Sequence, residues 1–133
     1  MRTIKFRGRM VHYDGWIYGS LLLSSDGMAS IWPIESNKLG DIKDVGNCTV
    51  GQFTGLKDKN GVEVYEGDVV IFDRKNQVVK WNNLHVCWGL FIDDQMNDEI
   101  IADWIREDGK VPELWMSSDI EVIGNIHENP ELL

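Results

Sequence analysis

The sequence predicts a mostly β protein with one short helix, an α+β arrangement in which strands dominate. Most of its apolar segments are short and are bounded by glycine, asparagine, aspartate or proline, which is the pattern of strands separated by turns. The 13 glycines and 3 prolines are spread along the chain and form no linker. A single segment has its apolar residues at helical spacing. These three observations favour a β-rich domain.

The first half of the chain contains three predicted strands and a polar segment. Residues 4–7 alternate apolar and basic side chains, as a half-buried strand does. Residues 16–23 are aromatic and branched and end at a Ser-Ser-Asp-Gly turn. Residues 31–32 form a short strand that Pro33 ends or places at an edge. Residues 35–47 are polar and contain glycine, so we expect a long loop or a minor domain junction there.

The second half continues the same pattern and adds the helix. We predict strands at residues 48–53, 69–73, 78–81, 85–92 and 120–126, the last interrupted at Gly124. Asn82 and Asn83 are suited to a hairpin between two of them. Residues 98–106 carry isoleucines and Trp104 on one helical stripe, with Gly109 just past the expected end. This stripe is typical of a core face.

Residues 51–70 contain the clearest turn signals in the sequence. Asn60-Gly61 predicts a type I′ hairpin turn, because both central residues of that turn take positive φ. Asp58 can cap the turn through its carboxylate. Glu66-Gly67-Asp68 predicts a second turn. This second turn leads into residues 69–72, which are apolar on both faces. They therefore predict a central strand that is covered on both sides.

This stretch resembles the core signature of the YopX family. The resemblance also includes residues 4–7 and the chain end 121–133, so it covers essentially the whole chain, although residues 14–47 and 77–116 match no motif. Its signature residues are Thr54, Gly55, Leu56, Asp58, Asn60, Gly61, Tyr65, Glu66, Gly67, Asp68, Gly124 and Asn125.

Membership would imply a small phage or prophage protein, cytoplasmic in the infected host. It would also imply one domain over residues 1–133: an N-terminal β subdomain at about 1–47 and an SH3-like barrel core at about 48–133. The family supplies no activity, so the resemblance assigns no functional site.

The net charge of −9 is unevenly distributed. Residues 1–67 hold 8 basic and 8 acidic residues, whereas residues 68–133 hold 5 and 14. An acidic protein repels phosphate backbones, so we do not expect nonspecific nucleic-acid binding as its main task. The N-terminus is basic, and on a strand Lys5, Arg7 and Arg9 would share one face. We interpret that face as solvated.

Several chemistries are not expected. Cys48 and Cys87 are too few for a disulfide framework, and each lies in an apolar strand-like setting. His85 and Cys87 are the only close His/Cys pair, and we interpret them as structural. The turn at Gly61 lacks the carboxylates of a calcium loop. No phosphate-binding glycine motif, apolar span or signal peptide is visible, so we expect no cofactor, metal or membrane.

The leading hypothesis is therefore a non-enzymatic phage accessory protein that acts by protein binding or self-assembly. The chain has six tryptophans, a residue type that often anchors protein interfaces, and we expect one or two of them to be exposed. The places to look are Lys80 and Trp81 and the basic strand with Arg7 and Arg9. Two alternatives stay open: an acidic decoy that imitates DNA, and a nucleic-acid-binding barrel, which needs a basic, aromatic face.

Overall fold

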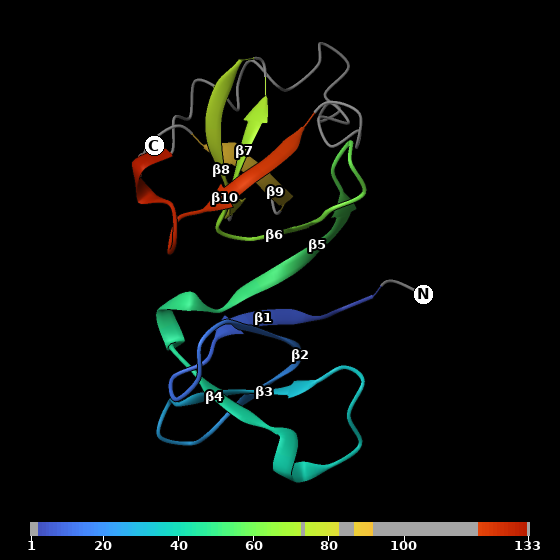
Figure 1. Cartoon of the computed structure of the whole chain (residues 1–133), viewed down its shortest axis with the longest axis vertical. Coiled ribbons are helices and arrows are strands. Elements are labelled where there is room, and N and C mark those ends of the chain that lie inside the picture. The colour runs from blue at the N-terminus through green and yellow to red at the C-terminus, as the bar shows by residue number, and fades with distance from the viewer. Residues whose placement is uncertain (1–2, 73, 83–86, 92–119, 133) are drawn as a thin grey trace. The chain divides into compact units, whose positions relative to one another are not determined.

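The computed structural model describes residues 3–72, 74–82, 87–91 and 120–132 (Figure 1). These residues form ten strands and three short 3-10 helices, with the strands in two antiparallel sheets. The mostly β prediction is confirmed. The predicted helix at 98–106 and the hairpin turn at Asn83 lie outside the described residues. The chain divides into two compact units, unit 1 at residues 1–55 and unit 2 at 56–133.

Unit 1 is built on antiparallel strands, of which the first four pair with their neighbours in sequence, whereas the fifth pairs with the first. They are β1 (Phe6–Arg9), β2 (Trp16–Leu23), β3 (Ala29–Pro33), β4 (Lys43–Val45) and the first part of β5 (Gly51–Lys57). The sheet order is β4-β3-β2-β1-β5-β6. The residues that follow β1 also pair with β4. Met10 forms a β-bridge with Val45, and the Val11 N–H donates a 3.0 Å hydrogen bond to the Asp44 carbonyl. The strands of unit 1 therefore curl around their own core.

Alternation along these strands sorts the side chains of unit 1 into a core face and an outer face. The core holds Ile17, Ala29, Ile31 and Val45, each at most 8% exposed. Phe6, Met10, Leu21 and Val50 pack around them. The residues between these core positions on β1–β3 point to the opposite face, which carries the candidate site.

Two expectations for unit 1 are wrong in detail. Residues 35–47 are not only a loop, because they contain the helix η1 (Leu39–Asp41), strand β4 and the start of η2 (Asn47–Thr49). The strand expected at 48–53 begins at Gly51, and Cys48 lies in η2 as an exposed free thiol. The strand end at Pro33 is confirmed.

Unit 2 contains a four-stranded antiparallel sheet of order β10-β7-β8-β9. Its elements are β6 (Glu63–Tyr65), β7 (Asp68–Phe72), β8 (Lys75–Asn82), β9 (Cys87–Phe91), β10 (Glu121–Asn125) and the helix η3 (Pro130–Leu132). Val69 and Val70 are both fully buried, so the start of β7 is covered on both faces as predicted, whereas Ile71 is 37% exposed. The register of β10 shifts between Val122 and Gly124, which agrees with the predicted interruption.

The core of unit 2 lies on one face of this sheet. It consists of Val64, Val70, Val79, Leu90 and Ile120, with Phe72, Trp88 and Val122 packed against them. Among the described strands both sheets are open, so the SH3-like barrel is not established. The division between the two units falls within β5, between residues 55 and 56, whereas the sequence suggested a division near residue 47.

Candidate binding surface

The signature turn after β5 is organised by the Asp58 carboxylate. Asp58 is 3% exposed, and its Oδ1 accepts hydrogen bonds from the backbone N–H groups of Asn60 (2.9 Å) and Val62 (2.8 Å). The predicted capping role of Asp58 is confirmed. The predicted type I′ turn is wrong, because Gly61 (φ 81°) has positive φ and Asn60 does not. The Gly61 N–H bonds to the Asp58 carbonyl, and the Asp58 N–H bonds to the Val62 carbonyl. This is the three-residue loop with a left-handed glycine at its end.

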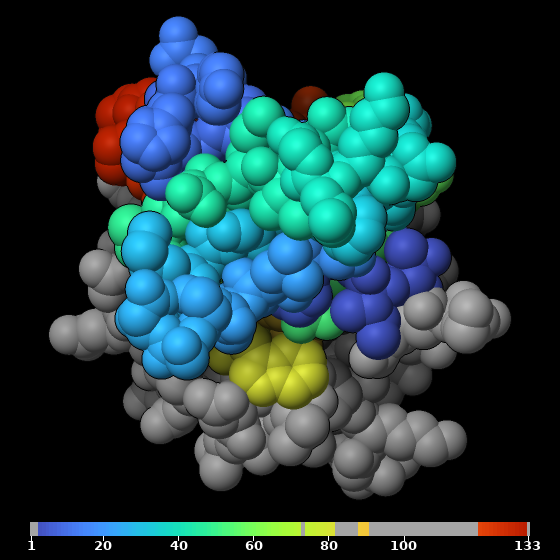
Figure 2. Space-filling model, turned by 90° about the horizontal axis from the view of Figure 1, so that it is seen from below, coloured from blue at the N-terminus to red at the C-terminus, as the bar shows by residue number. Residues whose placement is uncertain are grey.

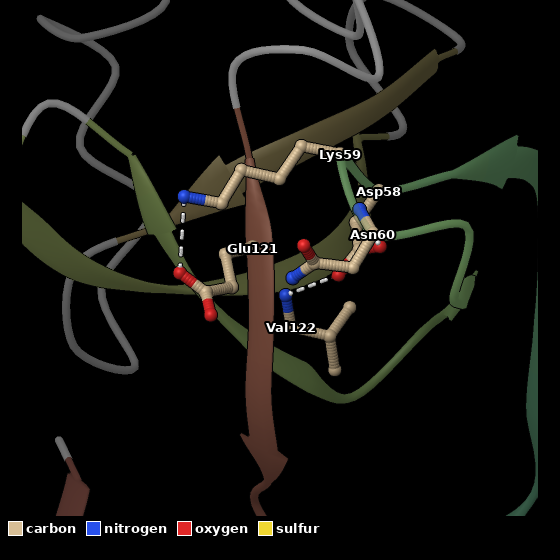
Figure 3. A network of polar contacts seen from close by, with 5 residues as sticks. All are labelled: Asp58, Lys59, Asn60, Glu121 and Val122. Atoms are coloured by element: carbon tan, nitrogen blue, oxygen red, sulfur yellow. Dashed lines mark hydrogen bonds and ion pairs between the residues drawn. The ribbon is translucent and has the colours of Figure 1, made fainter.

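The same turn joins the central signature to the chain end, as Figure 3 shows. Asp58 Oδ2 accepts a 2.9 Å hydrogen bond from the Val122 N–H of β10. On the other side the Lys59 N–H donates to the Ile120 carbonyl at 3.1 Å, and Lys59 Nζ lies 3.2 Å from a Glu121 carboxylate oxygen. Two segments that carry the family resemblance are therefore bound to each other.

Several other signature residues also make or constrain backbone contacts. The second turn forms as predicted: Asp68, 2% exposed, accepts the Tyr65 N–H at 2.8 Å, and the Gly67 N–H donates to the Val79 carbonyl. At the chain end Asn125 Oδ1 accepts hydrogen bonds from the N–H groups of residues 127 and 128. A side chain at Gly124 would overlap Asn129. Thr54 and Leu56 are partly exposed positions on β5.

Cations and aromatic rings share the outer face of β1–β3. We call this surface the aromatic–basic face, defined by Lys5, Arg7, Arg9, Trp16, Tyr18 and Trp32. In the register of the strands, Arg9 lies opposite Trp16 and Arg7 lies opposite Tyr18. Trp32 lies opposite Ser20, two residues beyond Tyr18, so it is a diagonal neighbour of that ring.

The members of this face differ in exposure. The expected solvated strand is wrong for Arg7, which is 7% exposed and holds its guanidinium carbon 4.7 Å from the centroid of Trp16. Arg9 is exposed, Tyr18 is 42% exposed, and Trp16 and Trp32 are partly exposed. Lys5 Nζ lies 4.8 Å from the ring centroid of Phe53. Arg7 therefore stacks on the Trp16 ring from a buried position, whereas Arg9 is exposed and Lys5 is partly exposed.

One acidic residue of β1–β4 lies on the side of the sheet that carries the aromatic–basic face. Within β1–β4, Asp44 is the one acidic residue at a register position on the same side, opposite Ser30. Its Oδ1 accepts a 2.8 Å hydrogen bond from the Ser30 hydroxyl.

Lys80 and Trp81, the other candidate pair, lie on β8 of unit 2. Trp81 is 39% exposed, and its ring meets that of Trp88 edge-to-face with centroids 5.0 Å apart. Side chains of β8, yellow in Figure 2, form part of the molecular surface. Because Trp88 packs against the unit 2 core, the exposed Trp81 extends that core and does not form a separate platform.

Glu66, also in the signature, lies beside Trp81. Burial raises the pKa of this carboxyl above its ordinary value of 4.5, and a hydrogen bond with the Trp81 backbone opposes the shift. A raised pKa in the folded state means that the folded protein favours the neutral acid. Glu66 therefore contributes stability below pH 4.5, which is lost as the pH rises through the folded-state pKa.

Replacing Glu66 with glutamine should remove this dependence, because the amide keeps an acceptor oxygen but carries no proton that titrates. We expect E66Q to match the parent protein below pH 4.5 and to be more stable than the parent at pH 7. Urea unfolding at a series of pH values measures both. A difference in the free energy of unfolding that does not change with pH would contradict this assignment.

The search for a metal site and for a membrane-spanning helix covers only the described residues. Among the described residues, no three His, Cys, Asp or Glu side chains are placed to hold a metal ion, and no helix is long and apolar enough to cross a membrane. His85 and the Cys87 side chain lie outside the described set. Their interpretation as structural stays a prediction.

The fold and this surface define a class: an antiparallel β protein of two units whose signature residues fix turns and whose outer sheet face combines cations with aromatic rings. The chain belongs to the YopX family, since residues 5–133 match the family described as YopX protein. It is similar in structure to protein EF1440 from Enterococcus faecalis, with a TM-score of 0.56 and 22% identity over 100% of this chain and 99% of that one. No curated protein matches it.

Proposed function

We propose that the protein is a non-enzymatic binding protein that holds an anionic partner on the aromatic–basic face. The observation that supports this is that Arg7 and Arg9 share one face of β1–β3 with three aromatic rings, and that Lys5 follows the same alternation just before β1. Tryptophan, tyrosine and arginine are the residues most enriched where proteins bind partners. Residues 1–55 carry six basic and five acidic residues, whereas residues 56–133 carry seven and seventeen. The cations of unit 1 are therefore a local exception in an acidic chain.

A phage or prophage origin and a cytoplasmic location are part of this proposal and rest on the family resemblance. An SH3-like barrel in the second part of the chain rests on it too. An acidic segment of a host or phage protein, or of a second copy of this chain, has the charge that the face requires. A nucleic acid has it as well.

The test compares two charge reversals of the same size. We expect R9E to weaken binding of fluorescein-labelled polyanions, an oligothymidylate and a polyglutamate of about 20 units each, by roughly tenfold or more at low salt. Lys38 is exposed in unit 1 but lies off the face, so K38E should change affinity less than about twofold. Fluorescence anisotropy measures both variants. If neither polyanion binds, or if both variants weaken binding equally, the proposal fails.

The acidic decoy is the second candidate, supported by the net charge of −10 in residues 56–133. Such a surface could imitate a phosphate backbone. It predicts the opposite preference: a polylysine of similar length should bind, and neither polyanion should.

A further inference from the structure

We infer that Asn60 is a site of spontaneous deamidation, and that the turn organised by Asp58 sets the rate of this reaction. The inference is independent of the binding function proposed above, because it concerns the signature turn of unit 2. Asparagine is one of the thermolabile residues of proteins. Asn60-Gly61 is the one Asn-Gly pair in the sequence, and glycine hinders a reaction at its own backbone nitrogen less than any other residue.

The reaction uses only this dipeptide and water. The Gly61 backbone nitrogen attacks the Asn60 Cγ, and the new N–Cγ bond closes a succinimide ring. The bond from Cγ to the amide nitrogen breaks, so the amide leaves as ammonia and takes up the proton that the Gly61 nitrogen loses. Water then opens the ring. Cleavage of the new N–Cγ bond gives aspartate, whereas cleavage of the bond to the main-chain carbonyl carbon gives isoaspartate, whose backbone runs through the side chain.

The position of Asn60 at the tip of the turn leaves room for the reaction. Asn60 and Gly61 are both exposed, so water reaches the ring and ammonia leaves freely. A Cβ at Gly61 would have no atom within 4 Å, so no neighbouring residue obstructs the side of the backbone where the nitrogen must approach. The surroundings of the pair therefore do not prevent ring closure.

The hydrogen bonds of the turn oppose the reaction. The Gly61 N–H donates to the Asp58 carbonyl at 3.0 Å, so the attacking nitrogen is held by its own proton. The Asp58 carboxylate fixes the turn on both sides of that nitrogen, because it accepts the N–H groups of Asn60 at 2.9 Å and of Val62 at 2.8 Å. The ring can close only while the turn is open, and such local opening does not require global unfolding. The rate of deamidation therefore depends on how firmly Asp58 holds the turn.

Deamidation changes the contact between the signature turn and β10. Both products add a negative charge to residues 56–133, whose net charge is already −10. Isoaspartate also lengthens the backbone of the turn, which displaces the N–H groups that the Asp58 carboxylate accepts. Because the same carboxylate accepts the Val122 N–H, the modification loosens the link to the chain end drawn in Figure 3.

Mass spectrometry of tryptic peptides measures the reaction in the full chain. The peptide of residues 60–74 contains Asn60 as its sole side-chain amide, so a gain of the deamidation mass is assigned without ambiguity. The peptide of residues 10–38 contains only Asn37, which is exposed and precedes Lys38, and it is the matched internal control. During incubation in mildly alkaline buffer we expect residue 60 to deamidate at least about fivefold faster than residue 37. Equal rates at the two residues would overturn the inference.

Two comparisons test the role of Asp58. We expect D58N to raise the rate about fivefold, because a neutral amide oxygen binds the turn less strongly than a carboxylate. K59A removes an exposed ion pair and should leave the rate within about twofold. The parent protein unfolded in urea should also deamidate at Asn60 faster than the folded protein, and this comparison decides the matter if circular dichroism shows that D58N does not fold. A folded rate equal to the unfolded rate, or equal effects of D58N and K59A, would contradict control by the turn.

Discussion

Replacing Asp58 with alanine is expected to lower the free energy of unfolding by about 3 kcal/mol or more. The carboxylate is 3% exposed and accepts three backbone N–H groups, from Asn60, Val62 and Val122. A buried donor that loses its acceptor costs roughly 1–3 kcal/mol, and D58A would orphan three donors at once. Urea unfolding followed by far-UV circular dichroism measures the loss.

Two further variants isolate the cause. D58N keeps one acceptor oxygen for the turn and places an NH2 group where the Val122 N–H donates, so its loss should be smaller than that of D58A. K59A removes only an ion pair whose side chains are 49% and 40% exposed, and should cost less than about 1 kcal/mol. Equal losses from K59A and D58A would show that the turn matters only through its surface charge.

The turn at Asp58 explains why the YopX signature, although specific, indicates no catalytic or ligand-binding residue. Asp58 and Asp68 are the buried carboxylates of the described chain, and both accept backbone N–H groups. Their oxygens satisfy donors in turns and across to β10, where an unpaired N–H would be costly. The signature therefore specifies a backbone path.

Local rules predicted much of the fold and failed where tertiary contacts decide. Strands β2, β7 and β8 have strong patterns and were found near their observed positions. Strand β4 has three residues, two of them charged, so its sequence carries no strand pattern, and its place depends on pairing with β3 and Met10. The turn type predicted at Asn60-Gly61 was wrong because the Asp58 carboxylate favours the three-residue loop over the type I′ turn.

The candidate face was predictable only in part. Period-two alternation alone places Arg7 and Arg9 together. Their association with Trp16 and Trp32 depends on the register between strands, which the sequence does not state. The burial of Arg7 likewise depends on its packing against Trp16. An alternation check on residues 16–22 would have placed Trp16 and Tyr18 on one face, although not beside the cations.

Replacing Gly19 with alanine is the second change expected to be severe, with a loss of about 3 kcal/mol or more. Gly19 lies in β2 between Phe6 of β1 and Pro33 of β3. A Cβ there would lie 1.9 Å from the Trp32 carbonyl oxygen and 2.9 Å from the Ile34 nitrogen. These are backbone atoms, so β2 and β3 would have to separate, which costs more than the roughly 1–3 kcal/mol of ordinary overpacking.

Two other glycines separate this steric effect from the general effects of adding a methyl group. A Cβ at Gly40 would have no atom within 4 Å, so the free energy of unfolding of G40A should stay within about 0.5 kcal/mol of the parent value. Gly27 has open space but a φ of 85°, so G27A should cost about 1 kcal/mol through backbone strain alone. Because Trp32 belongs to the aromatic–basic face, G19A should also weaken oligothymidylate binding, whereas G40A should not. If G19A unfolds at the same urea concentration as G40A, β2 and β3 do not approach as closely as the structure shows.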